Sequence, residues 1–313
     1  MAPAAVSPDL LAGPQGFDDA GAVRLGDGRV GLYTVDFFPP VVDDLEAYGA
    51  IAAANSLSDI YASGGEARVV LNLAGFPEEW DEEVLEPVFR AAVATVMESG
   101  ALWVGGHSVR SAEPLFGFAV FGDVSEDDLI TNGGARAGDR LVLTKPLGAG
   151  SLTTGLKRGL ANAEDVAAAA RGMARLNRGG AAAMRAVGVR AATDITGFGL
   201  LGHAANLARA SSVRLVLQAS ALPLYDGAAA LARDGVFSGG STRGKEALAE
   251  VVRVDDGVDA WMAKLCFDAE TSGGLLVAVP AERLDDFLAA LPADEPAAVV
   301  GEVAAGAPEV RLA

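Results

Sequence analysis

Short apolar runs that end at an aspartate, each followed by an alanine-rich stretch, recur along this chain of 313 residues. Residues 30–35 form such a run, which ends at Asp36 before two phenylalanines and two prolines. Runs of this kind are typical of buried strands. The stretch Leu45–Ala62 follows, with Asp43 or Asp44 as a candidate N-cap. The unit predicts a strand that delivers an acid to a turn, and then a helix.

The second half of the chain repeats this unit. Residues 190–193 form the predicted strand, which ends at Asp194. A glycine-containing turn and a predicted helix over 200–210 follow. Mixed α and β is therefore the predicted class. The turn-rich stretch 131–138 predicts a boundary between an N-terminal domain, 1–135, and a C-terminal domain, 136–313. The other expected elements are strands over 67–74, 101–104, 116–124 and 140–144, and helices over 78–99, with a kink at Pro87, and 165–187.

Composition excludes several classes of protein. The net charge is −18 and no cluster of Lys or Arg occurs, which argues against a nucleic-acid partner. An acidic protein can still bind a polyphosphate when Mg²⁺ bridges carboxylate and phosphate oxygens. Cys266 is the one cysteine, and His107 and His203 are the two histidines, so a disulfide or a zinc site of four Cys and His ligands cannot form. We expect a protein of the reducing cytoplasm that is neither secreted nor membrane-embedded.

Acids beside turns are the candidates for chemistry. They are Asp19 in the pair Asp18-Asp19, Asp36, Asp194, and Asp59, which shares a predicted helix face with Asn55 four residues earlier. Phosphoryl transfer depends on positioning phosphates and offsetting their charge, which acids that hold Mg²⁺ provide. The alternative is that strand-end aspartates only form turns. Glycine pairs, such as Gly273-Gly274, could cradle phosphate or simply turn the chain, because none has P-loop spacing.

Four other side chains have competing interpretations. Cys266 lies in an apolar segment, where a thiol usually packs as a small hydrophobe. His107 follows Gly105-Gly106 in a predicted exposed turn and could contact phosphate, whereas His203 lies on a predicted helix. Lys145 closes a strand before a proline, so it either reaches an anion or is a solvated surface lysine.

Taken together, these segments resemble selenophosphate synthetase (selenide, water dikinase) over nearly the whole chain. The matching strings in the first half are residues 34–38 with 42–44, residues 51–62 with Gly64-Gly65, and Gly-Gly-His-Ser at 105–108. Those in the second half are residues 143–148, 192–203 and 271–276. The family makes selenophosphate, AMP and phosphate from selenide, ATP and water. Its superfamily includes aminoimidazole ribonucleotide synthetase.

The resemblance implies a two-domain α+β fold like that of the aminoimidazole ribonucleotide synthetases. The N-terminal domain would bind ATP and form a homodimer, and the C-terminal domain would be an α/β sandwich. Mg²⁺ would be held by Asp19, Asp36, Asp59 and Asp194, and whether K⁺ is needed stays open. The expected ATP-binding residues are Asp36, Asp59, Asn55, Gly106, His107 and Ser108.

One departure from the family bears on catalysis. Family members carry, ahead of the motif matched by Asp18-Asp19, a glycine-rich segment with a reactive cysteine or selenocysteine and an essential lysine. Residues 1–18 contain neither, so no catalytic residue is assigned. We hypothesise that a selenocysteine codon upstream was read as a stop. As given, the chain is expected to bind Mg²⁺ and ATP but to be slow or inactive. The alternatives are a non-catalytic dimeric ATP-binding module and a sister enzyme, such as thiamine-monophosphate kinase.

Overall fold

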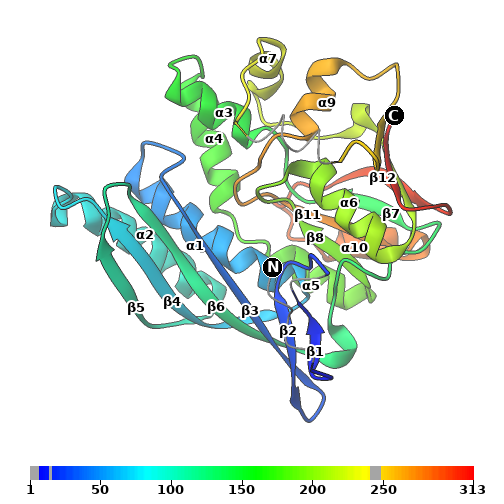
Figure 1. Ribbon diagram of the computed structural model, residues 1–313, viewed down its shortest axis with the longest axis horizontal. Helices are drawn as coiled ribbons and strands as arrows, with labels where there is room; N and C mark the ends of the chain where they lie inside the picture. The colour runs from blue at the N-terminus through cyan, green and yellow to red at the C-terminus, as the bar shows by residue number, and fades with distance from the viewer. Residues whose placement is uncertain (1–6, 14–15, 240–247) are drawn as a thin grey trace.

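The computed structural model describes residues 7–13, 16–239 and 248–313, which form two sheets with helices packed between and around them (Figure 1). The first sheet has the strand order β1-β2-β3-β6-β4-β5. All neighbouring strands in it are antiparallel except the parallel pair β4 and β5. Its strands are β1 (Leu10–Ala12), β2 (Gly21–Gly26), β3 (Arg29–Phe38), β4 (Glu66–Phe76), β5 (Leu102–Arg110) and β6 (Leu115–Ser125).

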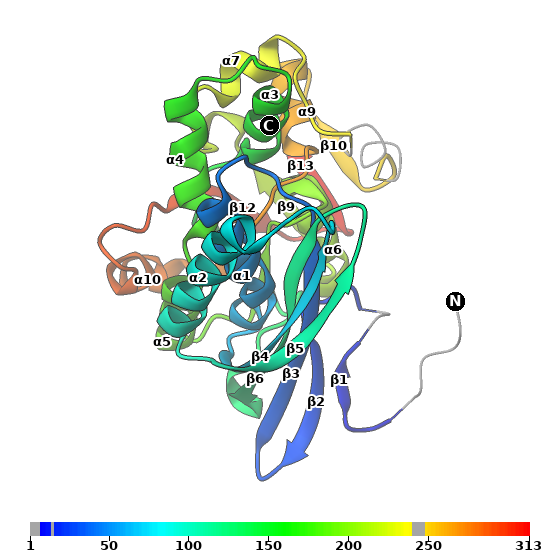
Figure 2. The same cartoon turned by 90° about the vertical axis from the view of Figure 1, so that its left-hand side faces the viewer.

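Helices α1 (Leu45–Ala62) and α2 (Glu82–Ser99) lie on one side of this sheet (Figure 2). The Asp44 carboxylate caps α1 by accepting a hydrogen bond of 2.7 Å from the Ala47 N–H. Most of α1 is buried, including its polar residues Asn55, Ser56 and Ser58. A helix buried on nearly all sides must be enclosed by other elements. This helix is the central element of the molecule.

The second sheet has the strand order β10-β13-β9-β12-β7-β11-β8. Its strands are β7 (Arg140–Leu143), β8 (Ala191–Asp194), β9 (Arg214–Leu217), β10 (Val252–Val254), β11 (Leu275–Val279), β12 (Ala298–Ala304) and β13 (Glu309–Leu312). The helices of this half are α3 (Ala149–Lys157), α4 (Ala163–Ala174), α5 (Arg178–Val187), α6 (Gly199–Ser211), α7 (Ala228–Arg233), α9 (Ala260–Cys266) and α10 (Leu284–Ala290). Single-turn 3₁₀ helices lie at Glu126–Asp128, Ala219–Ala221 and Ala281–Arg283.

One apolar core runs through both halves of the molecule. It joins residues of α1 and the first sheet, such as Ile51 and Val120, to Met184 of α5, Val277 of β11 and Phe287 of α10. A second core lies between the second sheet and α6. Because the first core crosses from one half to the other, the two halves are packed as a unit, and side chains of both can meet at one site.

The structure confirms the mixed α and β class and the predicted helix Leu45–Ala62. The domain division at 135/136 stays a prediction. Within the described residues, none of the helices combines the length and the apolar character needed to cross a membrane.

Three local predictions were wrong. The helix expected over 165–187 is two helices, α4 and α5, because residues 175–177 leave helical conformation and Asn177 turns inward to contact Ser58 and Gly273. Asp36 lies within β3 and not at its end.

The Gly-Gly-His-Ser segment at 105–108 is the third. It is not a turn but part of β5, paired with β4. Gly106 is needed there because a Cβ would overlap with Asn72 of β4.

Candidate active site

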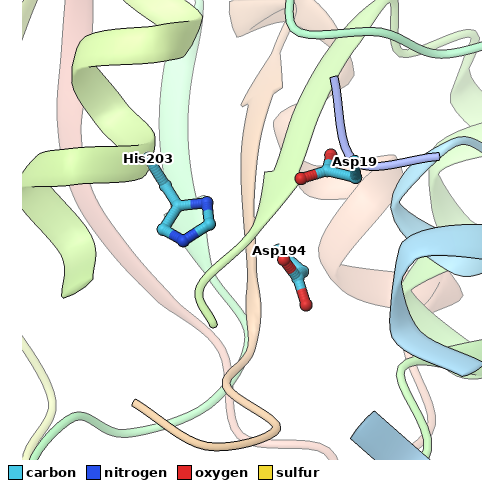
Figure 3. Close-up of side chains that lie close together, drawn as sticks. All are labelled: Asp19, Asp194 and His203. Carbon is cyan, nitrogen blue, oxygen red and sulfur yellow. The ribbon is translucent and has the colours of Figure 1, made fainter. Parts of the chain in front are cut away.

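The four predicted acids come from four different elements and gather where the two halves meet. Asp36 lies on β3, Asp59 on α1, Asp194 at the end of β8, and Asp19 in the turn before β2. Asp194 is 2% exposed and acts electrostatically on each of the other three. Figure 3 shows Asp19 and Asp194 beside each other, with His203 of α6 close by. The structure therefore assembles one carboxylate cluster from both sheets.

Burial and mutual repulsion dominate the electrostatics of this carboxylate cluster. Burial raises the pKa of Asp59 well above its ordinary value, and the charges of Asp194, Asp19 and Asp36 raise it further. The pKa of Asp19 is raised in the same way, by burial and then by Asp194. Burial and Asp194 raise the pKa of Asp36 to about 7. Among the described residues, none of the four acids forms an ion pair with Lys or Arg. Within the described part of the chain, the cluster thus lacks a counter-charge at contact distance.

Hydroxyl groups fix the direction of three of these carboxylates. Thr193 Oγ1 donates to Asp19 Oδ1 at 2.8 Å, and Thr34 Oγ1 donates to Asp59 Oδ2 at 2.5 Å. Thr196 Oγ1 donates to Asp194 Oδ2 at 2.7 Å. Each carboxylate keeps a second oxygen, and such preorganised oxygens suit a hard divalent cation.

His203 supports the cluster from the α6 side. Its Nε2 lies 2.5 Å from the Thr196 carbonyl oxygen, which makes Nε2–H a donor. Its Nδ1 lies 3.3 Å from Thr193 Oγ1. Burial lowers the pKa of His203, so the ring is neutral at pH 7. His203, Asp19 and Asp194 each offer a ligand atom, and these atoms lie within 4.8 Å of one another. Because the single Thr193 hydroxyl proton goes to Asp19, His203 Nδ1 packs against Thr193 without a hydrogen bond, and the ring is held through Thr196.

Asn55 links the acids to the second half of the molecule. Its Nδ2 donates to Asp36 Oδ2 at 3.3 Å, and its Oδ1 accepts the Ser272 N–H at 2.8 Å. Ser272 has a positive φ of 47°, and its buried Oγ has no hydrogen-bond partner among the described residues. A non-glycine residue held in this conformation next to buried acids often marks a binding site.

Lys145 fits neither interpretation drawn from the sequence. It is 1% exposed, and its Nζ donates to the carbonyl oxygens of Arg175 at 2.7 Å and Ser272 at 2.9 Å. Burial, together with the nearby Arg175 charge, lowers its pKa to about 7. Lys145 therefore holds the Ser272 backbone in place. Cys266 is fully buried, and burial raises its pKa to about 12, as expected of a packed thiol.

Gly106, His107 and Ser108 do not join the acids within this chain. They lie on the exposed edge strand β5, separated from β3 and Asp36 by β4 and β6 (Figure 1). A role for them in ATP binding stays a prediction. Sequence reasoning missed Thr34, Thr193 and Ser272, because their roles depend on contacts between segments far apart in the chain. It also missed Thr196, whose hydroxyl group donates to Asp194 two residues earlier.

A pH dependence of stability follows from the raised pKa of Asp36. The folded state keeps a proton on this acid up to about pH 7, whereas the unfolded chain releases it near pH 4. The folded state thus binds more protons between these values, so the free energy of unfolding should fall as pH rises from 5 to 7. His203, whose pKa is lowered, acts in the opposite sense near pH 6, and Lys145 does so above pH 7, but the raised pKa values of Asp19 and Asp59 add to the effect of Asp36.

Urea unfolding in EDTA at several pH values measures this effect. The Asp43→Asn variant, altered at an exposed acid outside the cluster, should show the same slope as the wild type. A free energy of unfolding that rises from pH 5 to 7 in EDTA would contradict the assigned burial of the acids.

Comparison with known proteins places this arrangement in a class. Family models described as AIR synthase related protein, N-terminal domain and C-terminal domain, match residues 17–124 and 136–312. Solved structures share the fold at low sequence identity. Thiamine-monophosphate kinase from Stenotrophomonas maltophilia has a TM-score of 0.70 at 20% identity, over 97% of this chain and 91% of its own. Hydrogenase maturation protein HypE in complex with ATP has a TM-score of 0.68 at 19% identity, over 98% and 86%. The chain is a two-domain protein of the AIR synthase related class.

Relatives of much higher identity define the family within that class. The selenide, water dikinase of Porphyromonas gingivalis is 46% identical over 275 residues, which are 88% of this chain and 78% of the relative. That of Burkholderia pseudomallei is 44% identical over 314 residues, 99% of this chain and 89% of the relative. That of Myxococcus xanthus is 44% identical over 97% and 88%. The chain belongs to the selenide, water dikinase family.

Proposed function

We propose that this protein makes selenophosphate from selenide and ATP, with water as the second acceptor and AMP and phosphate as the other products. The observation that carries the proposal is the carboxylate cluster at the junction of the two halves, in a chain whose relatives are named selenide, water dikinase. Buried acids that repel one another, with no cation paired to them among the described residues, favour a bound divalent metal. The paired acceptors, selenide and water, distinguish this reaction from that of a simple kinase.

In this proposal Asp19, Asp36, Asp59 and Asp194 hold Mg²⁺ against the phosphates of ATP. The metal would offset negative charge on the phosphate oxygens and on the transferring group. Asn55 would keep Asp36 oriented, and the Ser272 Oγ, which has no hydrogen-bond partner among the described residues, would be available to a phosphate oxygen. Elevated pKa values mean that the metal-free cluster carries protons, which metal binding would displace.

We also propose a homodimer that forms through the uncovered face of the first sheet. Tyr33, Val35 and Phe37 alternate along β3 and therefore share one face, where they are 39%, 55% and 52% exposed. Val104 of β5 is 59% exposed. Helices α1 and α2 cover the other face (Figure 2). Apolar side chains gathered on an uncovered sheet favour a protein partner. A second copy packed on this face would also bring residues of the partner subunit close to His107 and Ser108. Sedimentation of the purified chain tests this association.

The proposal places the protein in the reducing cytoplasm, because its one cysteine is a buried free thiol. It also keeps the division into an ATP-binding domain, 1–135, and a second domain, 136–313.

Phosphorus NMR of the chain with Mg-ATP and selenide under reducing conditions tests the reaction. Formation of AMP and a selenium-bonded phosphate, dependent on selenide, would support the proposal. Turnover with thiamine monophosphate in place of selenide would instead assign the chain a thiamine-monophosphate kinase activity. Mg-dependent ATP binding without turnover of either acceptor would favour a non-catalytic ATP-binding module.

A further inference from the structure

A cavity of about 300 Å³ lies between the end of α1, the start of β4, the end of α2 and one face of α5. Its polar lining residues are Tyr61, Glu66, Arg68, Ser99, Arg178 and Arg185. None of the four clustered acids is among the described residues that line it. The cavity is therefore a separate site, and it needs an explanation of its own.

Tyr61 lines this cavity, and its hydroxyl group lacks a well-formed hydrogen bond within the described part of the chain. Its side chain is 1% exposed, and Ser99 Oγ lies near its Oη without normal hydrogen-bond geometry. The neighbouring Ser99 Oγ donates to the Val96 carbonyl at 2.6 Å and accepts the Ala101 N–H at 3.1 Å. Leaving a buried hydroxyl without a partner is energetically costly, so such groups are normally matched by another group.

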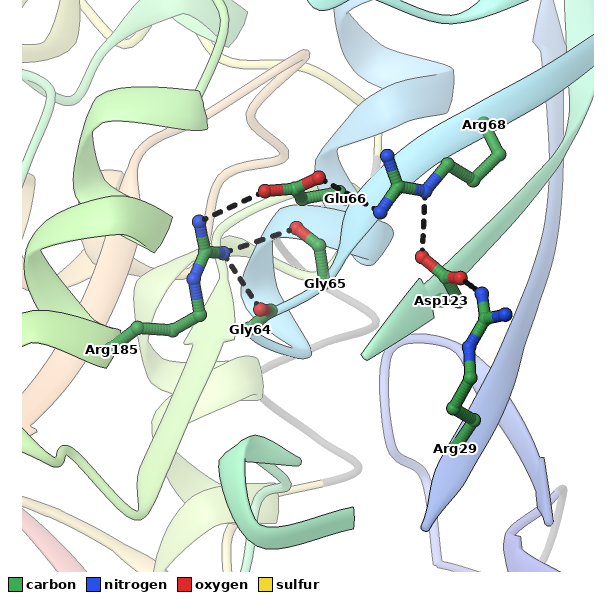
Figure 4. Close-up of polar contacts among 7 residues, drawn as sticks. All are labelled: Arg29, Gly64, Gly65, Glu66, Arg68, Asp123 and Arg185. Atoms are coloured by element: carbon green, nitrogen blue, oxygen red, sulfur yellow. Dashed lines mark hydrogen bonds and ion pairs between the residues drawn. The ribbon is translucent and has the colours of Figure 1, made fainter. Parts of the chain in front are cut away.

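Two of the three arginines at the cavity are held by uncharged groups. Arg178 donates to the Glu98 carbonyl oxygen at 3.0 Å. Arg185 donates to the carbonyl oxygens of Gly64 at 2.8 Å and Gly65 at 3.4 Å (Figure 4). Backbone carbonyls fix the guanidinium groups in place without neutralising their positive charge, and the one carboxylate of the described residues that approaches Arg185 is that of Glu66. Each guanidinium has five N–H donors, so more remain for a ligand.

Glu66 is the one acid among the described lining residues, and its carboxylate is shared by two arginines. Its Oε2 lies 3.0 Å from Arg68 Nη2, and its Oε1 lies 3.7 Å from Arg185 Nη2 (Figure 4). Arg68 also pairs with Asp123 outside the cavity, at 2.7 Å, and Asp123 pairs with Arg29. Three guanidinium groups thus face one carboxylate in a protein whose net charge is −18. Such a local excess of positive charge is a feature of anion sites.

The face of α5 leaves room for a ligand. Four lining residues share one face of α5, because Ala181, Ala182 and Arg185 follow Arg178 by three, four and seven residues. Two alanines lie between the two arginines. The two arginine side chains are long hydrogen-bond donors, and the short alanine side chains between them leave space for a compact ion.

From this geometry we propose that the cavity binds a tetrahedral oxyanion, either a free ion or the phosphoryl group of a small metabolite. The oxygens would accept hydrogen bonds from Tyr61 Oη, Arg178 and Arg185, a donor set that matches phosphate or sulfate. The bound anion would lie next to α1, α2 and α5. It would therefore stabilise the packing between the two halves of the molecule. The proposal does not depend on the metal site.

Calorimetric titration of inorganic phosphate into the whole protein tests this proposal. The titration is done in EDTA at constant ionic strength, because without metal the carboxylate cluster repels anions. Saturable binding is expected, and Tyr61→Phe, which removes only the hydroxyl group, should weaken it about tenfold. Arg178→Gln should weaken it at least as much. The control is Arg110→Gln, whose side chain is 78% exposed in the first half of the chain.

Two results would overturn the oxyanion site. One is the absence of saturable binding to the wild type, and the other is binding that Tyr61→Phe and Arg178→Gln leave unchanged. Glycerol phosphate and sulfate, titrated in parallel, separate the two sources of the anion. Tighter binding of the phosphate ester would assign the site to a metabolite, and equal binding of both would assign it to a free ion. If Tyr61→Phe unfolds, Arg178→Gln alone decides, with its thermal unfolding recorded alongside. Mg-dependent ATP binding should be intact in both variants, so failure here leaves the proposed function standing.

Discussion

The Asp194→Asn variant is expected to lose Mg-dependent ATP binding by about 100-fold or more, since even residues that merely support metal ligands contribute 10- to 100-fold. Asp194 acts on all three other acids of the cluster and is almost fully buried. Asparagine has the same shape and can still accept the hydrogen bond from Thr196 Oγ1. The change therefore removes a charge and one of the oxygens proposed to hold Mg²⁺, with little change in volume. Isothermal titration of ATP with and without Mg²⁺ measures the loss.

The same variant should be more stable than the wild type when no metal is present. Removing one buried charge relieves the repulsion that raises the pKa of Asp36 and Asp59. Stability gained at the expense of a functional site is a common result of such changes. Asp43→Asn is the control and should change neither quantity. An Asp194→Asn protein that binds Mg-ATP as tightly as the wild type would show that the metal ligands are other residues.

The second large effect is expected from Gly273→Ala, which should destabilise the fold by about 3 kcal/mol. A Cβ at Gly273 would overlap with the Ile195 carbonyl oxygen, one residue after Asp194. The backbone segments that carry Gly273 and Ile195 would have to separate, because the Ile195 carbonyl oxygen does not belong to a flexible side chain. Gly273 O also accepts a hydrogen bond from Asn177 Nδ2 at 2.9 Å. Urea unfolding of the metal-free protein measures the effect.

Gly257→Ala is the matched control for this prediction. A Cβ there meets nothing within 4 Å, and its φ is not in the left-handed region. Its effect should be within about 0.5 kcal/mol. A Gly273→Ala protein as stable as the control would mean that the close approach between the two segments is wrong.

Local pattern was enough to predict much of the fold. The helix Leu45–Ala62 was predictable because Asp44 caps it and glycines follow it. The strands that carry Asp36 and Asp194 were predictable from apolar runs. The helix expected over 165–187 was not, because its alanines fit a helix throughout and only the inward contacts of Asn177 break it. Propensity is a weak guide where tertiary contacts compete with it.

The carboxylate cluster could be predicted only as a set of residues. The residue pattern, with three acids beside predicted turns and Asp59 on a predicted helix, and the family resemblance both selected Asp19, Asp36, Asp59 and Asp194, but their distances depend on how two sheets pack. The groups that hold the cluster in place, such as Lys145 and Ser272, meet across 127 residues of sequence, and no local pattern carries that information. The buried state of Lys145 is a clear example, since lysine side chains are usually solvated.

The most direct test of the proposed metal and nucleotide site is a crystal structure of this protein with Mn²⁺ and a non-hydrolysable ATP analogue, with anomalous scattering recorded for manganese. The proposal predicts manganese peaks in contact with carboxylate oxygens from among Asp19, Asp36, Asp59 and Asp194, with the phosphates of the analogue on the other side of the metal. Manganese and analogue bound elsewhere, with the four acids in contact only with protein, would contradict it.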